Sequence, residues 1–544
     1  MKKIYTLGLL AALAVIALNA CSREDRIIET PVEEQAQGYT LIVNAEKVAA
    51  TKGLQDPVDK MIKTYWKAGE KVYAYQYDYD AGKWEELSVL TADASETGST
   101  TLRGTLSKVP NQGGFKLYLH SPSVDYSQQY GVLNESTEYS IEDHFDYAIA
   151  RVTAFDVDET SKTVTATCDG FSSQQAIVKF NFLDSKGNPI PHPATLEIED
   201  QAEGDNKCMW IKIGPKDGKI DQEEHVWDGK VTVDCSGYLA ADGIYVALSN
   251  VESSSKLHLT LTTAETDTEH YSYTYTYDKT GIRFQNGCYY EINVKMKKAP
   301  IDLSQIDAPF TAVDGDVLTG VLSQKYPITI AAGAAIRLKD ATIFFNAADD
   351  EELTSFDTQR YRFAGLTCEG NADIYVEGHN IVRGFHWYYP GIFVPQGSYI
   401  RIYDGDGDDA QELLEVSSNG YAAGIGGGLD PAVRACGEIE TYCNINAIGG
   451  RHAAAIGSSG ALDEPYSTCD DIQINDGEVH AEGGDSAAAI GGGYHASCRD
   501  IVVAHYADVY VKRGSPEADY IGHGVEGTCG NVSILNPSYV YKEN

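Results

Sequence analysis

Short stretches in which apolar and polar residues alternate recur along the first 300 residues. They lie at 39–45, 72–77, 115–119 and 174–182. A period of two residues is typical of a β-strand with one face on a core. These stretches predict an all-β chain with two tandem β-sandwich domains, residues 38–173 and 174–299. Pro300 marks the end of the second, and we assign 300–317 to a linker.

From about residue 318 onward glycine becomes frequent and an internal repeat appears. The tetrad Ala-Ala-(Gly/Ala)-Ile ends at Ile425, Ile456 and Ile490 and is echoed at Ile521, steps of about 31 to 34 residues. Each copy is followed by a cysteine and then a β-branched residue: Cys436 and Ile439, Cys469 and Ile472, Cys498 and Ile501, Cys529 and Val532. Small residues suit tight corners, while inward Ile and Val stack about 4.8 Å apart. Residues 318–544 therefore predict a right-handed parallel β-helix, and the leucine ladder of a leucine-rich repeat is absent.

Composition narrows the choice of partners. The chain has 42 Lys and Arg against 80 Asp and Glu, and a formal net charge of −38 repels phosphate backbones and anionic lipid. We therefore expect no nucleic-acid partner. The 36 Tyr, 52 Gly and only 4 Met favour short strands and tight turns over packed helices.

The first residues indicate export. Lys2 and Lys3 precede an apolar run that ends near Leu18, shorter than the ~20 residues that a spanning helix needs. The segment 1–20 resembles a lipoprotein signal peptide, which implies acylation of Cys21. The alternative is an ordinary cleavage site with a chance cysteine. Residues 21–37 lack periodicity and predict a flexible tether, so the lipid on Cys21 would be the only membrane attachment.

Several short segments of the first two domains follow one another in a recognisable order. Trp66, Gly69, Glu70 and Val72 form a W-x-x-G-(E/D)-x-V pattern at the entry to a strand, and the segments 146–148, 174–180 and 289–304 come after it. In this order they resemble the landmarks of the fimbrillin family of pilins and adhesins from anaerobic Gram-negative bacteria.

The resemblance implies transthyretin-like sandwich domains and an outer membrane lipoprotein that joins other pilus subunits by donor-strand exchange. It also implies proteolytic processing after a basic residue, here Lys52, where family members often have arginine. The alternative is that Lys52 is an ordinary exposed lysine in a loop and has no role in processing.

Two clusters are candidate binding sites. Flat rings can stack on sugar C–H faces, so the neighbouring aromatics form a candidate glycan site: His386, Trp387, Tyr388 and Tyr389. Packing at the end of the β-helix or against the second sandwich is the alternative. Oxygen-rich side chains have the density of a calcium loop: Asp404, Asp406, Asp408, Asp409 and Glu415. A solvated turn is the alternative, because Asp409 stands where such a loop needs glycine.

An acidic residue precedes the stacked position in three repeats. Glu438, Asp471 and Asp500 hold this place, and Asn531 holds it in the fourth. Paired carboxylates would suit glycoside cleavage, whereas Asp and Asn also cap turns for backbone reasons. No Ser-His-Asp, phosphate-loop or zinc-ligand pattern is present, so we expect no cofactor apart from a possible calcium ion. The repeated cysteines are expected to stack as buried thiols.

These observations predict a surface-anchored cell adhesion or fimbrial protein, a tip or minor pilin, and no enzyme. Its β-helix would present a binding surface for a glycan or a cell-surface protein. A polysaccharide lyase or glycoside hydrolase is the first alternative, and it would need Arg434, Arg451 or Arg499 beside the acidic residues. A passive stalk or scaffold is the second.

Overall fold

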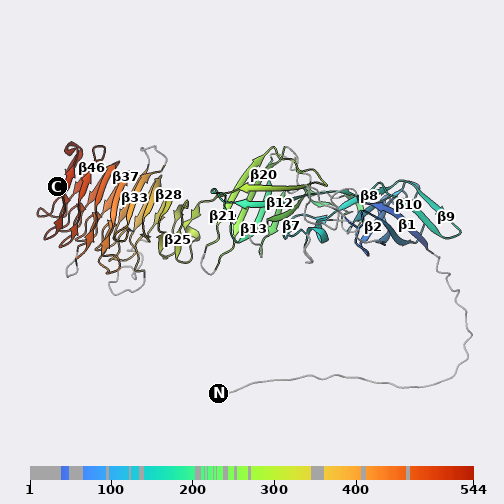
Figure 1. Cartoon of the computed structure of the whole chain (residues 1–544), viewed down its shortest axis with the longest axis horizontal. Coiled ribbons are helices and arrows are strands. Elements are labelled where there is room, and N and C mark those ends of the chain that lie inside the picture. The colour runs from blue at the N-terminus through green and yellow to red at the C-terminus, as the bar shows by residue number, and fades with distance from the viewer. Residues whose placement is uncertain are drawn as a thin grey trace, which may run out of the picture.

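The computed structural model describes residues 38–47, 65–93, 97–119, 121, 124–133, 140–202, 210–213, 215–216, 219–223, 226–227, 229–236, 243–249, 251, 254–266, 271–344, 361–405, 412–460 and 466–543. Cys21, Lys52 and the segments predicted as signal peptide (1–20) and tether (21–37) lie outside these residues. The protein is 53% strand and 3% helix, which confirms the all-β prediction. Among the described helices, none has the length and apolar character needed to cross a membrane. Figure 1 shows three groups of strands in a row, with the first and last strands at opposite ends.

The first group is a sheet that wraps around one core. Its main path runs β11-β8-β5-β2-β3-β4-β1-β10-β9, and β16 joins it by pairing with β3. The strands are β1 (Tyr39–Glu46), β2 (Lys71–Asp78), β3 (Lys83–Ala92), β4 (Ser99–Leu106), β5 (Phe115–Leu119), β8 (Ala148–Val152), β9 (Phe155–Asp158), β10 (Thr163–Thr167), β11 (Ser172–Ser173), β15 (Pro215–Lys216) and β16 (Lys219–Glu223). A π-helix, η1 (Ile141–Phe145), precedes β8. The N-terminal strand β1 therefore lies inside the sheet, between β4 and β10.

The second group has two sheets on a shared core. One has the order β19-β12-β22, and the other β23-β21-β20-β13-β18-β7. Their strands are β7 (Gln128–Gln129), β12 (Ala176–Leu183), β13 (Pro193–Asp200), β18 (Lys230–Asp234), β19 (Ile244–Leu248), β20 (Lys256–Thr263), β21 (Thr274–Thr280), β22 (Tyr289–Lys295) and β23 (Lys297–Lys298). A small sheet, β17-β14-β6, contains β6 (Val124–Asp125), β14 (Trp210–Ile213) and β17 (Val226–Trp227). Because β6 and β7 pair with β14 and β18, part of the first predicted domain joins the second group.

The third group is a stack of strands that pair in parallel with their equivalents in the next repeat, and we call Ile301–Glu543 the parallel stack. One sheet contains β25 (Phe310–Ala312), β27 (Ile328–Ile330), β29 (Leu366–Cys368), β32 (Ile392–Phe393), β35 (Ile425–Gly426), β39 (Ile456–Gly457), β43 (Ile490–Gly491) and β47 (Ile521–Gly522). A second contains β36 (Ala435–Cys436), β40 (Thr468–Cys469), β44 (Ser497–Cys498) and β48 (Thr528–Cys529).

The largest sheet of the stack has two rows of strands that meet at the long strand β28 (Ala334–Ile343). One row is β30 (Ala372–Glu377), β33 (Tyr399–Asp404), β37 (Glu438–Tyr442), β41 (Ile472–Asp476), β45 (Ile501–Val503) and β49 (Val532–Ile534). The other is β31 (His379–Arg383), β34 (Leu413–Ser417), β38 (Ile445–Ile448), β42 (Glu478–Glu482), β46 (Asp508–Lys512) and β50 (Val540–Glu543). β24 (Ile301–Asp302) and β26 (Val317–Val321) also belong to it, and two short helices are η2 (Leu303–Gln305) and η4 (Pro537–Tyr539).

The repeat positions form the predicted ladders. Ile425, Ile456, Ile490 and Ile521 pair in register, and the first three are fully buried. The cysteines at 436, 469, 498 and 529 also pair in register, and all described cysteines are free thiols. The glycine after each isoleucine has a positive φ, and a Cβ on Gly457 would lie 2.0 Å from the carbonyl oxygen of Gly491. The repeats approach so closely there that only glycine fits.

Residues 300–317 are not the linker that the sequence suggested. β24 pairs with β26, and Ile301, Leu303 and Phe310 are buried in the core of the parallel stack. The stack is also attached to the second group, because Lys298 Nζ lies 2.6 Å from Asp316 Oδ1 and 3.6 Å from the ring centre of Tyr273. The buried side chains of Ile301, Leu303 and Phe310 thus form the first layer of the stack.

Candidate functional sites

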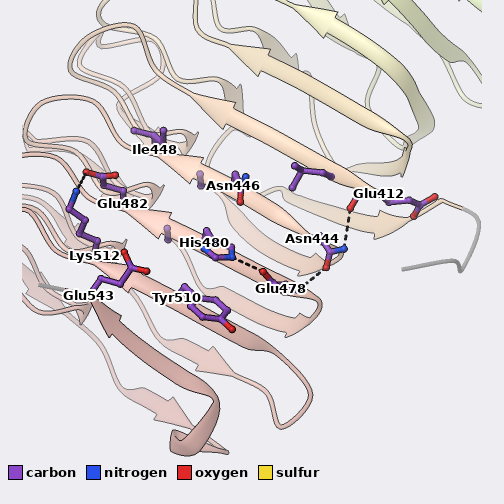
Figure 2. Close-up of a pocket in the computed structure, with 13 residues that line it drawn as sticks. Glu412, Asn444, Asn446, Ile448, Glu478, His480, Glu482, Tyr510, Lys512 and Glu543 are labelled. Atoms are coloured by element: carbon purple, nitrogen blue, oxygen red, sulfur yellow. Dashed lines mark hydrogen bonds and ion pairs between the residues drawn. The ribbon is translucent and has the colours of Figure 1, made fainter. Parts of the chain in front are cut away.

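An open groove of about 760 Å³ lies on the row of strands that ends at β50. Figure 2 shows that Glu478, His480 and Glu482 project into it from β42, and Tyr510 and Lys512 project from β46. The three residues of β42 alternate with buried Val479 and Ala481, so the strand period places them on one outer face. Parallel pairing then aligns equivalent side chains of successive repeats in columns.

One column of the groove is aromatic. The rings of His480 and Tyr510 are stacked with centres 4.4 Å apart, and those of Tyr510 and Tyr541 with centres 4.5 Å apart. Because the rings of His480 and Tyr541 cover the two faces of Tyr510, that side chain presents mainly its edge and its hydroxyl group to solvent. Partial burial is the first cause that raises the pKa of Tyr510, followed by the charge of Tyr541, so its phenol is neutral at pH 7. The column can therefore donate hydrogen bonds.

Charged side chains frame this column. Glu478 Oε1 lies 2.7 Å from His480 Nε2, and Lys512 Nζ lies 2.5 Å from Glu482 Oε1. The hydrogen bond from Lys512 to Glu482 raises the pKa of the lysine. The groove thus combines phenol, amide, carboxylate and ammonium groups in fixed rows. Such an array suits a ligand rich in hydroxyl groups, which can both donate and accept hydrogen bonds.

The predicted aromatic glycan site is only partly accessible. His386 and Tyr389 are buried, with 3% and 8% of their surfaces exposed, whereas Trp387 and Tyr388 are half-buried. Burial raises the pKa of Tyr389 to about 12, with a further contribution from Asp430. The four rings therefore share no common exposed face. The four residues lie between β31 and β32, within the stack. The alternative that they pack at the end of the β-helix is therefore wrong.

The predicted calcium loop lies largely outside the described residues. Asp406, Asp408 and Asp409 fall there, Asp404 ends β33, and Glu415 lies in β34. Glu415 Oε1 is 2.9 Å from His379 Nε2 in the preceding repeat. In the part of the chain that the structure describes, no cluster of three His, Cys, Asp or Glu side chains could hold a metal ion. The calcium site stays a prediction.

Two of the acidic residues before the stacked positions, Asp471 and Asp500, bind the backbone of the next repeat, whereas Glu438 Oε1 accepts a hydrogen bond of 2.9 Å from the side chain of Gln473. Asp471 Oδ1 accepts a hydrogen bond from the N–H of Asp500, and Asp500 Oδ1 accepts one from the N–H of Asn531. Arg499 approaches Asp471, with Nε 3.9 Å from Oδ1, but its side chain is 71% exposed. Arg451 instead pairs with Asp485, and Arg434 donates to the carbonyl of Leu429. The capping role that the sequence left open accounts for these aspartates.

The sequence did not single out the environment of β1. Leu41, Val43 and Ala45 point into the core of the first group with at most 3% exposure. On one side β1 pairs antiparallel with β4, and on the other it pairs in parallel with β10. Lys47 directly follows the last residue of β1, continues the same inward alternation and is buried. A buried lysine in this position points to a specific partner for its charge.

Comparison with known proteins gives no assignment. No family model and no curated protein match the chain. One similar solved structure is a candidate cell adhesion protein from Bacteroides uniformis, with 12% identity, a TM-score of 0.26, and coverage of 48% of this chain and 96% of that one. Another is shaft pilin SpaA from Lactobacillus rhamnosus GG, with 10% identity, a TM-score of 0.20, and coverage of 48% and 99%. At these values the likeness carries neither a family nor a function to this chain.

Proposed function

We propose that the protein is a surface-anchored subunit of an adhesive fibre. In this proposal the first two strand groups are tandem fimbrillin-type sandwiches, and the parallel stack is a right-handed β-helix that presents the binding surface. The observation that carries the proposal is the place of β1, an N-terminal strand inserted between two others. The alternating strands and the ladders of the stack support the two fold assignments.

In this proposal β1 is the strand that is exchanged. Removal of an edge strand leaves the rest of a sheet paired, but removal of β1 would unpair one edge of β4 and one of β10. It would also uncover the core positions that Leu41, Val43 and Ala45 fill. A strand from a neighbouring subunit would restore both sets of hydrogen bonds and the core, which is β-augmentation. We therefore propose cleavage after Lys52, departure of β1, and its replacement by a strand of another subunit.

The exchange can be tested on the purified full chain. Treatment with a trypsin-like protease should release a fragment that contains β1, detected by mass spectrometry, and should yield oligomers on size-exclusion chromatography. The Lys52→Ala variant should keep β1 and stay monomeric. If the uncut variant forms the same oligomers, or if the cut protein retains β1 and stays monomeric, strand exchange is not how this protein assembles.

We further propose that the groove beside Tyr510 binds a glycan without cleaving it. The polar rows of β42 and β46 support binding, and both carboxylates already have partners, since Glu478 contacts the His480 ring and Glu482 pairs with Lys512, which leaves neither as an obvious acid or base. Glycan-array binding by the full chain should fall at least about 10-fold in Tyr510→Phe, which loses one phenolic hydroxyl. Tyr403→Phe, on the opposite row of the same sheet, is the matched control. Turnover of a bound polysaccharide would favour the enzyme alternative.

A further inference from the structure

The end of β1 sits in a pocket that is built around a positive charge. The side chain of Lys47 is fully buried, and its Nζ lies 3.1 Å from both carboxylate oxygens of Glu70. The same Nζ donates a hydrogen bond of 2.9 Å to the carbonyl of Tyr65 and lies 4.3 Å from the ring centre of Trp66. A carboxylate, a carbonyl and an aromatic face are all favourable partners for an ammonium group.

This pocket belongs to the part of the protein that would remain after β1 leaves. Trp66 is fully buried and packs edge-on against Phe171, with ring centres 5.4 Å apart. Gly69 turns the chain with a φ of +83°, which lets Glu70 Oε2 accept the N–H of Lys67 at 3.0 Å. The side chain of Glu70 is only 2% exposed. The segment Trp-x-x-Gly-Glu therefore forms walls of the pocket, while Phe171, which packs on Trp66, is itself held by β1, because its N–H donates to the carbonyl of Glu46 at 3.0 Å.

Departure of β1 would remove Lys47 from the pocket, and a replacing strand without a cation there would bury the carboxylate of Glu70 without this ion-pair partner. Removing one partner of a buried ion pair is strongly unfavourable, because the remaining charge has lost its compensation. A replacing strand with an apolar side chain at that place would make this situation permanent. Only a strand that brings its own cation restores the pair.

We propose that the strand which replaces β1 carries a lysine or arginine in the register of Lys47, and that the Trp66–Glu70 pocket selects the strand and its register. The proposal rests on the strand exchange proposed above. The partner strand would place apolar or small residues at the positions of Leu41, Val43 and Ala45 and a basic residue two positions later. A slip of one residue would turn its apolar face outward, and a slip of two would remove the cation from the pocket.

The test uses the full chain after cleavage at Lys52 and removal of the β1 fragment by mild denaturant and refolding. Four synthetic peptides of residues 38–49 are titrated: the natural one and its Lys47→Arg, Lys47→Met and Glu46→Gln forms. Glu46 is the matched control, because it adjoins Lys47 but is exposed. We expect Lys47→Met to bind about 100-fold more weakly or worse, and Lys47→Arg and Glu46→Gln to stay within about 5-fold of the natural peptide.

The Glu70→Gln variant completes the cycle. It keeps the shape of the side chain but removes the charge, so the natural and Lys47→Met peptides should bind it within about 5-fold of each other. Circular dichroism of the uncut variant confirms that it folds. If natural and Lys47→Met peptides bind the cut wild-type chain equally, strand exchange stands and the pocket does not select a cation. If no peptide binds, the exchange itself is refuted, and the inference with it.

Discussion

Substitution of Ile456 by aspartate is a direct test of the parallel stack. Ile456 is fully buried and pairs in register with Ile425 in one repeat and Ile490 in the next. The aspartate would place a carboxyl group between two apolar neighbours, where the ladder offers only backbone already used for strand pairing. The damage should concentrate in the repeats on either side, because each repeat contacts mainly its neighbours.

The size of the effect follows from two contributions. Loss of a buried isoleucine side chain costs about 2–5 kcal/mol in well-packed cores. Burial of a polar group without a hydrogen bond adds about 1–3 kcal/mol, even if the carboxyl takes up a proton to avoid a buried charge. We therefore expect the unfolding free energy of the stack to fall by about 3–8 kcal/mol.

Hydrogen exchange by mass spectrometry on the full chain can locate this loss. Ile456→Asp should greatly raise exchange in peptides of β35, β39 and β43 and leave the first strand group unchanged. Ile448→Asp is the matched control, because Ile448 is 51% exposed in the same repeat. It should cost no more than about 1 kcal/mol, including repulsion from the opposed Glu482. Tyr494→Ser, at a half-buried ring, should also stay within about 1 kcal/mol. Equal effects of Ile456→Asp and Ile448→Asp would refute the buried ladder.

Three further outcomes are expected. Gly457→Ala should destabilise the stack by several kcal/mol, because the new Cβ would meet the carbonyl of Gly491. Gly82→Ala should cost only about 1 kcal/mol, because Gly82 also has a positive φ but open space around it. Similar shifts in melting temperature for the two variants would contradict this reasoning. Hydrogen bonds from the side chain and N–H of Ser161 and the N–H of Thr160 hold the pKa of Asp158 below its usual 3.8. The turn between β9 and β10 should thus be fully stabilised above that pH and lose this contribution as pH falls through the lowered pKa, and an NMR titration midpoint above 3.8 would show the opposite. Cys21→Ser should release the protein from the outer membrane, and unchanged fractionation in cells without pilus partners would disprove lipid anchoring.

The regular parts of the fold could be predicted because their signal repeats. Ile425, Ile456 and Ile490 recur at nearly equal spacing, so each copy adds evidence for the same alignment of repeats. The register in which their strands pair could therefore be predicted. The two-residue strands β6 and β7 are too short to show any period, and their partners β14 and β18 lie far along the chain. Their place in the second group therefore had no local signal. The bounds of the two sandwich domains stay predictions, whereas the predicted linker at 300–317 is part of the parallel stack.

Side-chain environments were harder to predict than strands. His386 and Tyr389 are buried because the chain folds back closely between Gly384 and Pro390, where a Cβ on Gly384 would lie 2.3 Å from the carbonyl oxygen of Tyr389. No pattern in the sequence shows that approach. Lys47 had a usable signal, since it continues the alternation of β1 toward the core, but a lysine is normally read as exposed. Its partner Glu70 lay in a segment already noted for its resemblance to a family.

The direction of the hydrogen bonds in the parallel stack sets how it carries mechanical load. Strand pairing joins each repeat to the next, so these bonds lie along the direction in which the repeats accumulate (Figure 1). Tension applied along that direction stretches all the bonds of an interface together. The longer ladders, such as β42 with β46, share more of that tension than two-residue ladders such as β39 with β43. A force that the second strand group transmits to the first layer through Lys298 and Asp316 would therefore act on a stiff body, which fails when whole repeats separate.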